Sequence, residues 1–167
     1  MQMDIEQLAK RQLRDYDRHQ PGGLFAGYSI PMTVDDAYAL QMAVARLRVQ
    51  RGEPVAGYKV GCISPAMQAQ LGLEYPVFGR VFGTEIHSSG VVLNLDHFDS
   101  LAVEGEFAVR IARDIPDANW LPSHADEAIS SGFAVIELHN YVFRNTPQMS
   151  PLFIETFRDS TLAFSYR

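Results

Sequence analysis

The sequence of 167 residues contains a single cysteine, Cys62. One thiol excludes a disulfide framework within the chain and is typical of proteins in a reducing compartment. The histidine nearest to it in sequence is His87, and no recognisable nucleophile signature surrounds either residue. We therefore predict that Cys62 is a buried structural thiol and not a nucleophile.

Long apolar runs and positive charge are also scarce. No uninterrupted apolar stretch reaches the length of about 18 residues that a membrane span needs, and the start, MQMDIEQLAKR, lacks the pattern of a signal peptide. Fourteen lysines and arginines face twenty acidic residues, for a net charge of −6. This balance disfavours binding to nucleic acid or to an anionic membrane. We expect a cytoplasmic protein without such partners.

The N-terminal part has the pattern of two helices. Residues 4–19 place apolar side chains at helical spacings, and a second helix is expected from Thr33 to Gly52, with Thr33 and Asp36 placed as a capping box. Strand-like patterns dominate afterwards, including one over Val91–Leu95. The sequence thus predicts an α+β chain with a helical segment at residues 1–54 and a single compact β-rich unit at 55–167.

Residues 103–113, VEGEFAVRIAR, alternate with a period of two. Such a strand places Glu104 and Glu106 on one face, with Cα atoms roughly 6.6 Å apart. The apolar residues of odd number are expected to pack on the opposite face: Val103, Phe107, Val109 and Ile111. Two carboxylates at this spacing can converge on one hard cation. More often such a pair is simply the solvated face of a half-buried antiparallel strand.

Glu137 lies in a second apolar strand-like run, GFAVIELHNYVF, at residues 132–143. An unpaired carboxylate in such a run costs several kcal/mol unless a charge or a metal compensates it. Glu137 is therefore the best candidate for a third ligand. His139 shares its face and is either a hydrogen-bonding partner of a metal-binding carboxylate or an ordinary structural histidine.

Lys59 lies in the strand-like run VAGYKVGC at residues 55–62, flanked on its own face by Gly57 and Gly61. Glycines within a strand often mark the close approach of a ligand or another backbone. Lys59 is thus either a functional ammonium above an open floor or a surface lysine on an edge strand.

Several of these segments together resemble a known family. The segments Gly57–Gly61, Tyr75–Phe82 and Glu104–Glu106, followed by Glu137, resemble the 2-keto-4-pentenoate hydratase and 4-oxalocrotonate decarboxylase group of the fumarylacetoacetate hydrolase superfamily in order and spacing. The resemblance covers residues 4–147. It implies a mixed β-roll, a divalent metal, Mg²⁺ or Mn²⁺, held by the three glutamates, and an active-site role for Lys59.

The resemblance implies a metal-dependent hydratase (lyase) acting on small 2-oxo acids such as 2-hydroxypenta-2,4-dienoate, in the catabolism of aromatic compounds. One position departs from the pattern, because Val77 stands where many of these hydratases carry an aspartate thought to act near the lysine and the attacking water. Decarboxylation of 4-oxalocrotonate and hydrolysis of an acylpyruvate therefore remain alternatives. A catalytically silent binding protein is a third.

The C-terminal stretch, residues 151–167, matches no motif of that family. Family members are longer and carry more strands after the third metal ligand, so we expect the β-roll to be incomplete at the C-terminus. Sheet edges that normally pair would then be exposed, which favours a homo-oligomer.

Overall fold

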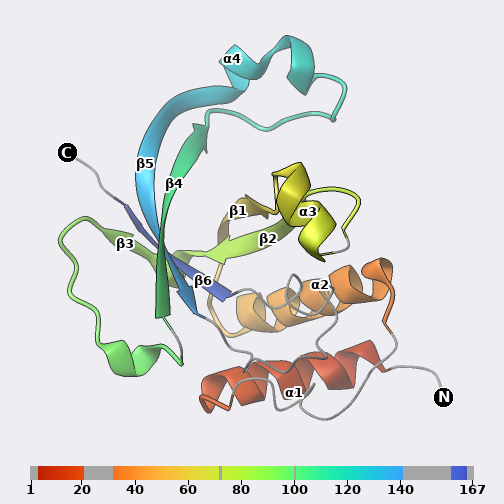
Figure 1. Ribbon diagram of the computed structural model, residues 1–167, viewed down its shortest axis with the longest axis vertical. Coiled ribbons are helices and arrows are strands. Elements are labelled where there is room, and N and C mark those ends of the chain that lie inside the picture. The colour runs from red at the N-terminus through yellow and green to blue at the C-terminus, as the bar shows by residue number, and fades with distance from the viewer. Residues whose placement is uncertain (1–3, 21–31, 72, 100, 141–158, 165–167) are drawn as a thin grey trace.

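The computed structural model describes residues 4–20, 32–71, 73–99, 101–140 and 159–164. Helices α1 and α2 come first in the chain and lie together at one end of the fold, and strands in two sheets follow with two short helices between them, which confirms the α+β class (Figure 1). The helices are α1 (Ile5–Asp17), α2 (Val34–Gln50), α3 (Pro65–Leu71) and α4 (Ala125–Ala128). The strands are β1 (Val55–Gly61), β2 (Val77–Phe82), β3 (Ile86–Ser88), β4 (Leu101–Ile111), β5 (Ile129–Asn140) and β6 (Asp159–Phe164). In these ranges no helix is long and apolar enough to cross a membrane.

Both expected N-terminal helices are confirmed. The capping box is present at the start of α2, where the backbone N–H of Asp36 donates to the Thr33 hydroxyl oxygen at 3.1 Å and the backbone N–H of Thr33 donates to the Asp36 carboxylate at 3.0 Å. The hydrogen bond from the Thr33 backbone lowers the pKa of Asp36. Helices α1 and α2 pack against each other around Ala9, Leu40 and Ala43.

Arg48 joins the last turn of α2 to the strands. Its buried guanidinium donates to Glu53 at 2.7 Å and to the buried Glu85 at 2.5 Å, and it lies 3.7 Å from the centre of the Phe82 ring at the end of β2. A basic residue in the last turn of a helix is already explained by the helix dipole. The structure gives Arg48 a larger role, because this network fixes α2 to the β1–β2 region.

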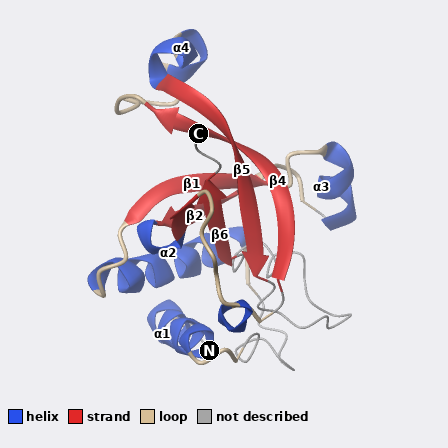
Figure 2. Ribbon diagram, turned by 90° about the vertical axis from the view of Figure 1, so that its left-hand side faces the viewer, coloured by secondary structure: helices blue, strands red, loops and turns tan. Residues whose placement is uncertain are grey.

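The strands form two sheets. Strands β1 and β2 pair antiparallel, and the other sheet has the order β3-β6-β5-β4. Strands β4 and β5 are antiparallel along their length and place Glu104 directly opposite Glu137. They curve away from the helices, so that α4 lies at the opposite end of the molecule from α1 in both views (Figure 2). The expected strand at Val91–Leu95 is wrong, since residues 91–94 have no regular structure.

The apolar face of β4 is exposed, contrary to expectation. Val103, Val109 and Ile111 are 51% to 63% exposed, and Phe107 is 89% exposed. The register places Ile136 of β5 on the same face, and it is also exposed. Alternation correctly predicted which side chains share this face. The expectation that they pack was wrong because, in the ranges described above, no element covers them.

We predict that Arg48→Leu lowers the free energy of unfolding by about 3 to 5 kcal/mol, because it leaves the Glu85 carboxylate buried without its cation. Arg46→Leu is the matched control, since Arg46 forms a largely exposed pair with Glu6 and its loss should cost no more than about 1 kcal/mol. Urea denaturation of both variants measures the difference, and equal losses would contradict a structural role for Arg48.

Candidate metal centre

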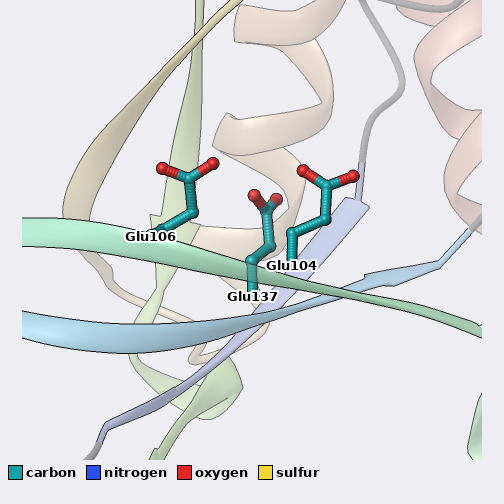
Figure 3. A group of neighbouring side chains, drawn as sticks. All are labelled: Glu104, Glu106 and Glu137. Carbon is teal, nitrogen blue, oxygen red and sulfur yellow. The ribbon is translucent and has the colours of Figure 1, made fainter.

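Three carboxylates meet on one face of the β4–β5 pair. Glu104 and Glu106 are two residues apart on β4 and therefore point to the same side, while Glu137 on β5 is the register partner of Glu104. Figure 3 shows all three side chains rising from the two strands in the same direction. One oxygen from each lies within 4.8 Å of the others. The structure thus brings together the three residues predicted from the sequence.

Like charges directly opposite each other destabilise a strand pair, and Glu137 is only 8% exposed. The cluster therefore requires nearby positive charge. Oxygens on opposite sides of one ion lie about 4.2 Å apart for Mg²⁺ and about 4.8 Å apart for Ca²⁺, from their usual metal–oxygen distances. The spread of the three carboxylate oxygens, within 4.8 Å of one another, is on this scale. The donor set, three hard carboxylate oxygens, fits such a cation.

Lys59 reaches this cluster from the other sheet. Its Nζ lies 2.5 Å from Oε1 of Glu137, so the contact joins β1 to β5 across 78 residues of sequence. Only 16% of the lysine side chain is exposed, which excludes the alternative of a surface lysine on an edge strand. The ammonium supplies part of the positive charge that the carboxylates need.

The glycine beneath Lys59 comes from the neighbouring strand. Gly79 of β2 is the register partner of Lys59, and a Cβ added to it would lie 3.4 to 3.8 Å from Cγ, Cδ and Cε of the lysine. Gly57, one of the glycines flanking Lys59 in sequence, faces open space. The open space predicted beneath Lys59 from Gly57 and Gly61 is therefore provided by Gly79, which lies in the GRVFG stretch. Its role follows from the register between β1 and β2.

His139 is 2% exposed, and its Nδ1 lies 3.4 Å from Oε1 of Glu137. The same carboxylate oxygen thus contacts Lys59 and His139. Strand β5 ends at Asn140, so the last three residues of the predicted run, 141–143, lie outside the described residues. Cys62 is buried, as expected.

Val77 begins β2 opposite Gly61. It lies on the face of the two-stranded β1–β2 sheet that carries Lys59 and Gly79. The departure from the family pattern therefore lies close along the strand to the lysine, where an apolar side chain supplies no proton donor or acceptor.

Known proteins are similar to this chain in sequence and in fold. The chain is 39% identical over 102 residues to the 2-keto-4-pentenoate hydratase of Burkholderia vietnamiensis, covering 61% of this chain and 39% of the relative. It is 28% identical over 135 residues to that of Paraburkholderia xenovorans, covering 81% of this chain and 49% of the relative. No family model matches the sequence.

A solved structure, 4-oxalocrotonate decarboxylase from Pseudomonas putida G7 complexed with magnesium and adipate, superposes with a TM-score of 0.83 at 20% identity. The match covers 98% of this chain and 62% of the decarboxylase. The predicted resemblance to the hydratase and decarboxylase group is confirmed. The chain spans less than half the length of the two hydratases of this group and about three fifths of the decarboxylase.

We predict that millimolar Mg²⁺ or Mn²⁺ raises the melting temperature, because a ligand that binds only the folded state stabilises it by RT ln(1 + [L]/Kd). Glu106→Gln should abolish the shift, whereas Glu74→Gln, an exposed glutamate outside the cluster, should retain it. Differential scanning fluorimetry with and without EDTA makes the comparison. A wild-type protein that does not respond to Mn²⁺ would contradict the metal centre.

Proposed function

We propose that the chain carries the metal-binding and lysine-bearing part of a divalent-metal-dependent hydratase, a lyase that acts on small 2-oxo acids such as 2-hydroxypenta-2,4-dienoate. The observation that supports this most strongly is the convergence of Glu104, Glu106 and Glu137 with the Lys59 ammonium at one point. We propose Mg²⁺ or Mn²⁺ as the cofactor, and the magnesium in the fold neighbour supports a divalent metal.

In this proposal the three glutamates hold the cation, which when bound supplies positive charge for an oxyanion that develops on the substrate. The reaction requires the dienol to lose its enol O–H proton and take up a proton on carbon as it becomes a 2-oxo acid, and then water to add across the remaining double bond. Lys59 lies beside the glutamates, where its ammonium can orient the substrate carboxylate or move a proton. In the structure its stem lies over Gly79 and its ammonium contacts Glu137.

Val77 is the reason to consider reactions other than hydration. Because the face of the β1–β2 sheet beside Lys59 carries valine where the resemblance implies an aspartate, the carboxylate expected near the attacking water is missing at that position. Decarboxylation of 4-oxalocrotonate uses the same charge stabilisation and adds no water, so it does not call for that carboxylate, and cleavage of an acylpyruvate also develops negative charge on such an oxygen. The fold likeness to a 4-oxalocrotonate decarboxylase favours the first of these.

We also propose that residues 55–167 form part of a β-roll of the fumarylacetoacetate hydrolase type, incomplete at the C-terminus, with residues 1–54 as its N-terminal helical segment. The exposed apolar face of β4 and the additional length of the fold neighbour support this. The same two observations favour the third candidate, a binding protein that retains the glutamates without turnover.

The activity test is Lys59→Met. At saturating Mn²⁺ we expect kcat/KM to fall at least about a hundredfold, the scale of one general acid–base or charge-stabilising group. Loss of dienol absorbance of 2-hydroxypenta-2,4-dienoate reports hydration, and release of carbon dioxide from 4-oxalocrotonate reports the alternative. Turnover that survives Lys59→Met would exclude the mechanism. A folded, metal-bound protein that turns over neither substrate would favour the silent binding protein.

Assembly provides a separate test. We propose a homo-oligomer in which a second copy covers the exposed apolar face of β4, because burying a large apolar side chain such as Phe107 contributes roughly 1.5 to 3 kcal/mol. Sedimentation velocity at micromolar concentration should detect a dimer or larger species, and Phe107→Asp should dissociate it. Val92→Asp is the control, since Val92 is exposed in a segment outside the sheet. A monomeric wild type would exclude this assembly.

A further inference from the structure

The carboxylate cluster already has a cation of its own. Lys59 is one of only two lysines in the sequence, and its Nζ lies 2.5 Å from Oε1 of the buried Glu137. The other, Lys10, is exposed on α1. A lysine and a bound divalent ion would therefore share the same carboxylate.

The stem of Lys59 limits how far this ammonium can move. Gly79 lies beneath it so closely that a Cβ there would stand 3.4 Å from Cγ, 3.8 Å from Cδ and 3.7 Å from Cε. The side chain is only 16% exposed and its tip is held at Glu137, so there is little room for the stem to swing away from the carboxylates. Because one oxygen of each of the three glutamates lies within 4.8 Å of the others, an ammonium that only shifts from Glu137 remains near any cation that they hold.

We propose that Lys59 is the resident counter-ion of the metal-free site and competes with the divalent cation for Glu137. Without metal, the ammonium offsets part of the repulsion among the three carboxylates. With metal, the ammonium must leave Glu137 and remains near a doubly charged ion of the same sign. The inference rests on the proposed function, because it requires the three glutamates to bind the metal.

The competition has a consequence for the order of events at the site. An ammonium that metal has displaced from Glu137 is available to the carboxylate of a 2-oxo acid, whereas in the metal-free site it is engaged with the protein. Lys59 can thereby contact an anionic substrate once metal occupies the site. This role is distinct from orienting the substrate or moving a proton during turnover.

The sign of the effect of Lys59 on metal affinity tests the proposal. A lysine that only orients Glu137 for metal predicts weaker binding when it is removed. A competing counter-ion predicts the reverse, because removal of a like charge within a few ångström strengthens binding of a dication. We expect the Kd for Mn²⁺ of Lys59→Met to be at least about tenfold lower than that of the wild type.

Isothermal titration with Mn²⁺ alone, without substrate, measures these constants. Lys59→Arg retains the positive charge and Lys10→Met removes an exposed one, so both should stay within about twofold of the wild type. The gain from Lys59→Met should shrink in a Glu137→Gln background, because the shared carboxylate is then neutral. If Lys59→Met does not fold, Lys59→Gln removes the charge with a polar side chain of similar length.

The outcomes distinguish the counter-ion role of Lys59 from the existence of the metal centre. Tighter Mn²⁺ binding by Lys59→Met, with both controls unchanged, supports the counter-ion role. Equal or weaker binding by that variant overturns it while leaving the metal centre intact. Failure of the wild type and of Lys59→Met to bind Mn²⁺ overturns the proposed function and this inference together.

Discussion

Repulsion among three carboxylates on paired strands governs how the groups around this site are arranged. The register of β4 and β5 places Glu104 opposite Glu137, and the period of the strand adds Glu106 to the same face. Because Glu137 is also buried, water offers it little screening. Positive charge must therefore reach this face from elsewhere in the fold, and β1 delivers it as Lys59.

The helices matter to the site because α2 contacts the two-stranded β1–β2 sheet, which carries this lysine. Gln41 of α2 donates to the backbone carbonyl of Phe78 at 3.1 Å, and the ring of Tyr38 stacks on that of Phe78 with centroids 4.6 Å apart. Arg48 adds the buried pair with Glu85 beyond the end of β2. Since β2 pairs with β1, these contacts set the position of Lys59 relative to β5. Helix α2 thus helps to bring the ammonium to the carboxylates.

Local pattern marked the three glutamates as candidates, and the resemblance was needed to predict them as one ligand set. Period-two alternation placed Glu104 and Glu106 on one face, and the apolar neighbours of Glu137 marked it as a carboxylate that needs a partner. The role of Gly79 was missed because it depends on the register between β1 and β2, which no single segment specifies. The packing of Phe107 was predicted wrongly for a related reason, since alternation tells which residues share a face and not what covers that face.

Arg48 illustrates the same limit at a helix end. A basic residue in a last turn is adequately explained by the helix dipole, and only the fold reveals that this one is buried against Glu85 and Phe82. The resemblance to hydratases and a decarboxylase contributes what the pattern could not, a chemical reason for three carboxylates and a lysine to meet. Val77 shows that the resemblance does not extend to every position.

The central claim is that Glu104, Glu106 and Glu137 hold one divalent cation with Lys59 beside it. Anomalous diffraction from crystals grown with Mn²⁺ and pyruvate tests it most directly. The account predicts one strong manganese peak bound by an oxygen from each glutamate, with the Lys59 ammonium displaced from Glu137. A cluster without manganese, in which Lys59 still contacts Glu137 while the metal lies elsewhere, would contradict it.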